Sequence, residues 1–157
     1  MRIGLLPGAR RDAMNLADTV RQGVQAENDG FDSVWFPQMS GFGFDALTII
    51  SMAGVQTERI ELGTAVIPTF PTHPLAMAKQ ALTAQVACGG RLTLGLGLSH
   101  KPSIEGTMGL SYQHPLRHMR EYLTVVRSLV DDGSVDFDGQ VFQVKSDINV
   151  PGSSPFP

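Results

Sequence analysis

Short apolar runs alternate along the chain with longer segments in which apolar residues recur every three or four positions. The short runs predict four buried strands, at 2–7, 33–36, 60–67 and 91–97. The longer segments predict four helices between and after them. Matching strand positions recur at roughly 30 residues, which predicts parallel strands because parallel neighbours need a crossover connection. These matching positions are Ile3, Val34, Leu62 and Leu92.

The predicted helices have recognisable starts. Asp12 and Asp45 are expected to cap the first and second helices, and His73-Pro74 and His114-Pro115 to begin the third and fourth. The residues expected to point inward are Leu16, Val20 and Val24 in the first helix, Leu47, Ile50 and Ala53 in the second, Leu75, Ala78, Leu82 and Val86 in the third, and Leu116, Met119, Leu123, Val126 and Val130 in the fourth.

An antiparallel hairpin is predicted after the fourth helix. Asp138-Gly139 is a common two-residue turn, and apolar residues flank it on both sides. Residues 149–157, rich in Pro, Gly and Ser, are typical of a linker. We expect one domain over residues 1–157. At this point two α/β architectures fit the pattern, a doubly wound open sheet and half of an eight-stranded barrel.

Composition excludes several classes of protein. The net charge is −3 and the twelve Lys and Arg residues are scattered, so a nucleic-acid-binding face is not expected. The single cysteine, Cys88, cannot form an intrachain disulfide and fits a reducing cytoplasm. We interpret it as a small apolar residue near a helix end. No apolar run is long enough for a signal peptide or a membrane span, so a cytoplasmic location is expected.

Known catalytic motifs are mostly missing from the sequence. It contains no H-E-x-x-H segment, no cysteine pair and no G-x-S-x-G, so neither a metal site nor a serine hydrolase is expected. Gly95-Leu96-Gly97 lacks the third glycine of a dinucleotide-binding fingerprint. We expect these glycines instead to let the backbone approach a neighbouring group closely.

The loops that follow the strands carry the candidate ligand contacts, because parallel strand–helix folds bind ligands at the carboxyl ends of their strands. The candidates are Gln38, Thr69, Ser99 and His100. Gln38 has the alternative role of satisfying loop backbone. His100 is the strongest candidate, because an imidazole can donate a proton near neutral pH. His118 is expected at the surface.

Six segments, in this order, resemble the luciferase-like monooxygenase superfamily and are closest to its oxidoreductases that use the deazaflavin coenzyme F420. They are "MRIGLLPGA", "SVWFPQ", "LGTAVIPTFPTHP", "GRLTLGLGLSH", "HMREYLTVVRSLV" and "VDFDGQVF". The resemblance implies a TIM (β/α)8 barrel. This chain would supply about the first four β/α units plus the hairpin and stop before strand five. It would then need a second half-barrel, or a second copy of itself in a homodimer.

The resemblance also implies a cofactor site. Relatives carry a non-prolyl cis peptide in the third strand behind the flavin ring, and Ala65-Val66 matches it by position. The segment Gly97, Leu98, Ser99 and His100 matches a loop that contacts the cofactor. Gln38 stands where some F420-dependent relatives have a catalytic histidine, so their sugar-phosphate dehydrogenase activity is not expected here. His100 is the expected proton donor.

The implied function is oxidoreduction, with hydride passing between coenzyme F420 and an unidentified organic substrate. One alternative is an FMN-dependent monooxygenase. Another is a half-barrel that binds a cofactor, or serves as a structural unit, without catalysis. The sequence does not identify the substrate.

Overall fold

The structure, a computed structural model, describes residues 1–7, 15–154 and 156. Its elements are β1 (Gly4–Leu5), α1 (Leu16–Asn28), β2 (Ser33–Phe36), α2 (Ala46–Gly54), β3 (Glu61–Thr64), β4 (Ile67–Pro68), α3 (Pro74–Ala87), β5 (Leu92–Thr93), β6 (Leu96–Gly97), the π-helix η1 (Pro102–Thr107), α4 (Pro115–Asp132), β7 (Ser134–Asp138) and β8 (Gln143–Asp147). None of the described helices is long and apolar enough to cross a membrane.

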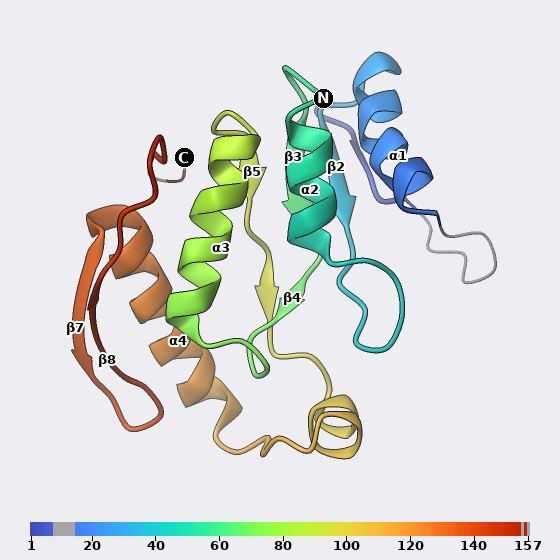
Figure 1. Cartoon of the computed structure of the whole chain (residues 1–157). Coiled ribbons are helices and arrows are strands. Elements are labelled where there is room, and N and C mark those ends of the chain that lie inside the picture. The colour runs from blue at the N-terminus through green and yellow to red at the C-terminus, as the bar shows by residue number, and fades with distance from the viewer. Residues whose placement is uncertain (8–14, 155, 157) are drawn as a thin grey trace.

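The strands form a parallel sheet in the order β1-β2-β3-β5, and β4 pairs with β6 in parallel beyond it. Helices α2 and α3 lie side by side over the sheet (Figure 1). The third and fourth predicted strands, at 60–67 and 91–97, are each split in two. The third forms β3 and β4, and the fourth forms β5 and β6. The parallel α/β architecture, with four successive strand–helix units and a hairpin, is confirmed.

The predicted register holds for three of the four strands. Val34 pairs with Leu62, and Leu62 pairs with Leu92. All three side chains are fully buried in the core. In β1, however, Leu5 rather than Ile3 pairs with Val34, and Ile3 is 50% exposed. The prediction was wrong by two positions, which keeps the side chain on the same face because strand side chains alternate with a period of two.

The opposite face of the sheet carries polar groups and one large ring. Trp35 lies there between strand neighbours, and its Nε1 donates to the Ser33 hydroxyl at 3.0 Å. Near the amino ends of the strands, the Thr93 hydroxyl donates to Glu61 Oε1 at 2.5 Å, and Arg2 pairs with Glu61 Oε2 at 2.6 Å. The sheet therefore separates a helix-covered apolar face from a second face that mixes polar and aromatic side chains.

Helix α1 begins later than predicted. Asn15 is its N-cap, and Asn15 Oδ1 accepts from the Ala17 amide at 2.9 Å. Asp12, the predicted cap, lies outside the described residues. Leu16 was predicted to be buried but is 37% exposed. The buried face consists of Val20, Gly23 and Ala26.

Helices α2 and α3 begin as predicted. Asp45 caps α2, and its Oδ1 accepts from the Thr48 amide at 2.8 Å. His73 caps α3, and Pro74 is its first residue. The prediction for Val86 was wrong, because Val86 is 40% exposed and Gln85 is buried beside it. The Gln85 Oε1 accepts from the Leu92 amide at 2.9 Å, whereas its Nε2 has no hydrogen-bond partner among the described residues.

Cys88 ends α3 and is fully buried, as expected for a small apolar residue. Burial raises the pKa of its thiol to about 11, despite the opposing charge of Arg91. The thiol is therefore protonated near neutral pH, which argues against a nucleophilic role.

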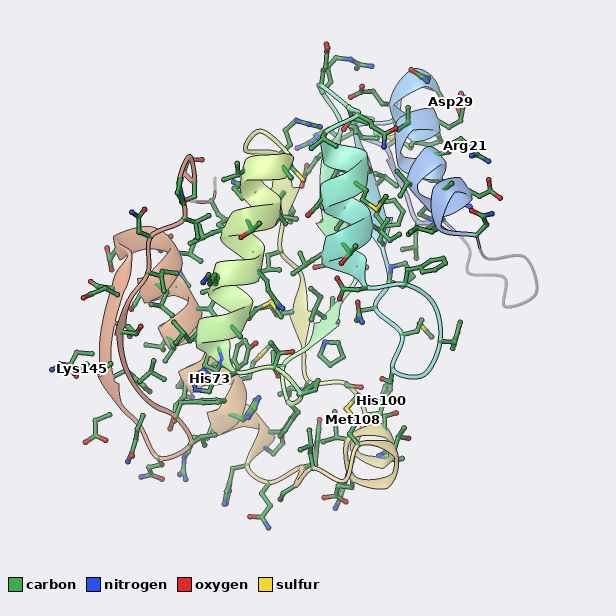
Figure 2. All side chains as sticks on the ribbon, viewed as in Figure 1. Arg21, Asp29, His73, His100, Met108 and Lys145 are labelled. Atoms are coloured by element: carbon green, nitrogen blue, oxygen red, sulfur yellow. The ribbon has the colours of Figure 1, made fainter. Side chains whose placement is uncertain are left out.

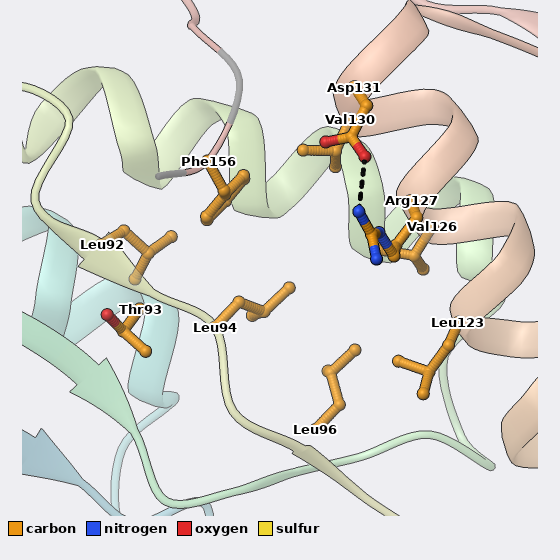
Figure 3. A pocket seen from close by; sticks show the side chains of 10 residues that line it. All are labelled: Leu92, Thr93, Leu94, Leu96, Leu123, Val126, Arg127, Val130, Asp131 and Phe156. Carbon is orange, nitrogen blue, oxygen red and sulfur yellow. Dashed lines mark hydrogen bonds and ion pairs between the residues drawn. The ribbon is translucent and has the colours of Figure 1, made fainter.

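The predicted inward face of α4 is right at Val126 and Val130, which are 4% and 9% exposed, and wrong at Leu116 and Leu123. Its buried stripe includes His118, Tyr122, Val125 and Leu129, whereas Leu116 is 72% exposed and Leu123 is 38% exposed. The stripe that contains Leu123, Val126 and Val130 lines a groove beside β5 and β6 (Figure 3). The buried face of α4 therefore shares Val126 and Val130 with the predicted stripe and extends beyond it to His118, Tyr122 and Leu129.

The hairpin β7–β8 forms as predicted, but its turn differs. Asp138 pairs with Gln143, so the loop spans residues 139–142 and not the dipeptide Asp138-Gly139. The Glu121 carboxylate on α4 accepts from the backbone amides of Gln140, Val141 and Phe142 at 2.8–3.1 Å. Burial raises the pKa of Glu121, but these three donors outweigh burial and hold the pKa below its usual value. The loop is thus fixed by a helix side chain.

The orientation of α4 is testable with a matched pair of substitutions. Leu129→Ala removes a fully buried side chain and is expected to lower the free energy of unfolding by about 3 kcal/mol. Leu116→Ala, at the exposed position that the sequence pattern placed inward, should change it by less than about 0.5 kcal/mol. Urea denaturation of both variants measures this, and similar losses in both would contradict the observed orientation of α4.

Candidate cofactor site at the carboxyl ends of the strands

A cis peptide joins Ala65 and Val66 between β3 and β4. This is the position at which the resemblance places the non-prolyl cis bond. The Ala65 amide still donates to the Phe36 carbonyl at 2.9 Å, and the Ile67 amide donates to the Gly95 carbonyl at 2.9 Å. Val66 therefore lies where strand pairing is interrupted, and the residues on either side of it are hydrogen-bonded to neighbouring strands.

The Val66 side chain lies against the glycines of the next strand. A Cβ atom added at Gly97 would lie 2.6 Å from Val66 Cγ2, and one at Gly95 would lie 3.3 Å from Val66 Cγ1. The first distance is shorter than a carbon–carbon contact allows, so Gly97 leaves the space that Val66 occupies. Val66 nevertheless remains 44% exposed. Val66 therefore forms a partly exposed apolar surface that packs on one side against the backbone of Gly95 and Gly97.

Thr64 secures the same interruption from β3. Its hydroxyl donates to the Gly95 carbonyl and accepts from the Gly95 amide, both at 2.8 Å. Thr64 is 1% exposed, so the two bonds are shielded from water. A side chain thus satisfies the backbone of Gly95 where the regular ladder between strands stops.

Gln38 follows β2 and contacts the start of α2. Its Oε1 accepts from the Ala46 amide at 2.7 Å. Together with Asp45, it satisfies amides of the first helical turn, which have no partner within the helix. Gln38 thus satisfies backbone, as the alternative interpretation proposed, but the Ala46 amide lies in the first turn of α2 and not in the loop. This bond also fixes where the glutamine amide lies.

Leu98, Ser99 and His100 form the turn between β6 and η1. Ser99 has a φ of 62°, in the left-handed region, and the imidazole-bearing residue His100 is exposed. The His100 carbonyl accepts from the amides of Ser103 and Ile104 at 2.9 and 3.0 Å, which starts the π-helix. Figure 2 labels His100 in the loop that leads to η1, and His73 at the start of α3.

The structure brings only some of the predicted residues together. Val66 and Gly97 are in contact, and Ser99 and His100 follow Gly97 directly. Thr69 is fully buried, and its amide donates to the Gly97 carbonyl at 2.9 Å. Thr69 therefore stabilises the backbone of the site at Gly97. Among the described residues, no group of His, Cys, Asp and Glu side chains is arranged to hold a metal ion.

The sequence reading missed a row of stacked rings. His118, predicted at the surface, is 5% exposed, and its Nε2 lies 3.1 Å from the Thr69 hydroxyl. Phe70 stacks between the rings of His118 and Tyr112, with centroid distances of 3.9 and 4.8 Å. The spacing of His118 from Tyr122, Val125 and Leu129 follows a helical face, and this pattern could have revealed it.

A cleft opens beside this row of rings. It has a volume of about 430 Å³ and is lined by the loop before α3, the start of α4 and the hairpin loop, including Phe70, His73, His118 and Phe142. The His73 Nδ1 accepts from the Leu75 amide at 3.2 Å, which leaves Nε2 as the protonated nitrogen of a neutral ring. The cleft therefore combines aromatic walls with hydrogen-bonding side chains.

The contact between Val66 and Gly97 can be tested by filling the space. Gly97→Ala is expected to lower the free energy of unfolding by about 1–3 kcal/mol, because the added methyl group overlaps Val66. Gly41→Ala is the control, because a Cβ there meets nothing within 4 Å. Adding Val66→Ala to Gly97→Ala should recover part of the loss in urea denaturation. Equal effects of Gly97→Ala and Gly41→Ala would contradict this packing.

The buried imidazole of His118 should make stability depend on pH. Burial lowers its pKa below 6.5, although the Thr69 bond and the Glu121 charge oppose this. The unfolded chain therefore takes up this proton first as the pH falls, and the free energy of unfolding decreases below about pH 6.5. His118→Gln should show a smaller decrease between pH 7.5 and 5.5 in urea titrations. Exposed His114→Asn is the control, and a decrease in His118→Gln equal to that of the wild type would contradict the assignment.

Several known proteins are similar to this chain. The family described as luciferase-like monooxygenase matches residues 1–157. A putative coenzyme F420-dependent oxidoreductase of Mycobacterium tuberculosis is 37% identical over 131 residues, which cover 82% of this chain and 36% of that protein. A monooxygenase from Streptomyces bottropensis superposes with a TM-score of 0.83 at 21% identity, over 98% of this chain and 50% of that one.

A further solved structure is the oxygenating constituent of 3,6-diketocamphane monooxygenase from Pseudomonas putida in complex with FMN. It superposes with a TM-score of 0.81 at 18% identity, over 96% of this chain and 45% of that one. The chain thus spans half or less of the length of these three proteins. The parallel strands, the Ala65-Val66 cis peptide and the family match agree, and the chain belongs to the luciferase-like monooxygenase family.

Proposed function

We propose that this chain is the amino-terminal half of an oxidoreductase barrel in which hydride passes between coenzyme F420 and an organic substrate. The observation that carries the proposal is the exposed Val66 surface beside Gly97, at the carboxyl ends of parallel strands. The M. tuberculosis relative is named as F420-dependent, which supports the same cofactor here. Ligands bind at this end of parallel strand–helix folds.

The residues fit a flat ring system. Val66 offers a half-exposed branched side chain, and the adjacent Gly97 has no side chain that would keep a ring away from the backbone. Ala65 is also small. When bound, a deazaflavin supplies hydride transfer at its central ring carbon, and the protein supplies position and electrostatics. Val66 would support one face of the ring, and Gly97 and Leu98 would line its edge.

Polar residues around this surface would orient the bound molecules. The Ser99 hydroxyl would hydrogen-bond to the cofactor, and the Gln38 amide, fixed by its bond to the α2 backbone, would contact cofactor or substrate. His100 is exposed beside Ser99, so its imidazole would hold the proton that the substrate gains or loses. Holding the reacting groups in place is the main contribution asked of these residues.

An FMN-dependent monooxygenase is the second candidate function. It is favoured by the fold shared with the P. putida monooxygenase, whose structure contains FMN. The surface formed by Val66 and Gly97 would suit either ring, because FMN and F420 share a flat tricyclic system. A half-barrel that binds the cofactor without turnover is the third candidate, and it would show cofactor binding alone.

Completion of the barrel is part of the proposal. Within the described residues, β5 and β6 each pair on one side only. A groove of about 420 Å³ runs along this edge, lined by Leu92, Leu94, Leu96, Leu123 and Phe156 among others (Figure 3). Unpaired strand edges, together with partly exposed Leu94 and Leu96 and exposed Leu123, favour association with further strands. We propose that a second half-barrel, or a second copy of the chain, covers this groove.

Cofactor titration with matched valine variants tests the proposal. Wild-type protein should quench the fluorescence of F420 or of FMN on binding, and the tighter ligand identifies the cofactor. Val66→Asp should weaken that binding at least about tenfold, because it places a charge against an apolar ring. Val55→Asp is the control, since Val55 is 69% exposed at the end of α2.

Two outcomes would overturn the proposed function. One is that the wild-type protein binds neither cofactor. The other is that Val66→Asp and Val55→Asp bind equally well. Thermal unfolding of both variants, measured in parallel, separates a loss of binding from a loss of folding.

A further inference from the structure

Ser99 has an unusual backbone conformation for its residue type. Its φ of 62° lies in the left-handed region, which costs a residue with a Cβ roughly 1–2 kcal/mol. Glycine adopts this conformation freely, and glycines already stand at 95 and 97 in the same segment. Since position 99 holds a serine, interactions around it have to keep the turn in this conformation.

Tyr112 makes such an interaction. Its hydroxyl donates to the Ser99 carbonyl at 3.3 Å, across the loop that contains η1. The Tyr112 backbone is held in turn, because its amide donates to Glu105 Oε1 at 3.3 Å. Fully buried Ile104 anchors the same loop in the interior. The tyrosine therefore reaches Ser99 from a backbone that is itself fixed.

The Tyr112 ring is positioned by the stacked rings beside it. Phe70 stacks on Tyr112 at 4.8 Å on one side and on His118 at 3.9 Å on the other. His118 is fixed by Thr69, whose amide donates to the Gly97 carbonyl at 2.9 Å. A continuous series of contacts thus runs from Gly97 through Thr69, His118, Phe70 and Tyr112 to Ser99.

We propose that Tyr112 is a positioning residue for the rim of the cofactor site. Through its hydroxyl, it holds Ser99 in the left-handed conformation and so sets the direction of the Ser99 and His100 side chains. The inference rests on the proposed function for the role of this rim. It adds a residue that touches no proposed ligand and acts only through the Ser99 backbone.

The two tyrosines of the chain offer a matched comparison. Tyr112→Phe removes the hydroxyl that contacts Ser99 and should weaken binding of F420, or of FMN if that is the cofactor, about fivefold. Tyr122→Phe is the control, because the Tyr122 hydroxyl is buried with no hydrogen-bond partner among the described residues. It should leave binding unchanged. Equal binding by both variants would contradict the proposal, provided that the wild type binds.

Hydrogen exchange decides the same question in the free protein. The Ser103 and Ile104 amides bond to the His100 carbonyl and therefore report on the turn. Their exchange should be about fivefold faster in Tyr112→Phe than in the wild type and unchanged in Tyr122→Phe. Unchanged exchange in Tyr112→Phe overturns the inference. Failure of the wild type to bind either cofactor overturns the proposed function instead, so the two failures are distinguishable.

A double-mutant cycle with Ser99→Gly tests the mechanism itself. Glycine adopts the left-handed conformation without help, so the exchange of the reporter amides should depend less on Tyr112 in that background. We expect Tyr112→Phe to accelerate exchange by less than about twofold in Ser99→Gly. The same fivefold acceleration in both backgrounds would show that the hydroxyl acts elsewhere and would contradict the role assigned to it.

Discussion

The contact between Val66 and the glycine backbone of the neighbouring strand is the constraint on which the site depends. Val66 occupies the space that a side chain at position 97 would fill, and Thr64 satisfies the backbone of Gly95 beside it. The two strands can therefore interrupt their pairing without leaving buried amides unpaired. This interruption places a branched apolar side chain at the carboxyl end of the sheet, where it remains partly exposed.

Helix α4 lies outside the sheet and fixes two loops at the same end of the molecule. It contributes two polar side chains to the interior, and each fixes a different loop. His118 holds the segment that follows β4 through Thr69, and Glu121 holds the hairpin loop through three backbone amides. Burying a polar group without a partner costs free energy, so these hydrogen bonds stabilise both the side chains and the loops they contact. Two of the loops at this end of the molecule are thus held by side chains of α4.

Much of the fold was predictable from the sequence because strand period and helix caps are local signals. Asp45, His73 and the Leu62–Leu92 register follow directly from such signals. The full inward face of α4 does not, because it includes His118 and Tyr122, whereas the apolar residues Leu116 and Leu123 are exposed. For the site, the glycines predicted a close approach, and the structure identifies Val66 as the group that approaches. The partner of Gln38 and the buried position of His118 depend on contacts between distant segments, which periodicity does not encode.

The central claim is that Val66 supports the face of a flat redox cofactor. The most direct measurement is the nuclear Overhauser effect between the Val66 methyl protons and F420 bound to the protein. We expect a cross-peak to the hydrogen on the central ring carbon, since that carbon would lie over the side chain. F420 that binds but shows cross-peaks only to residues distant from Val66 and Gly97 would contradict it.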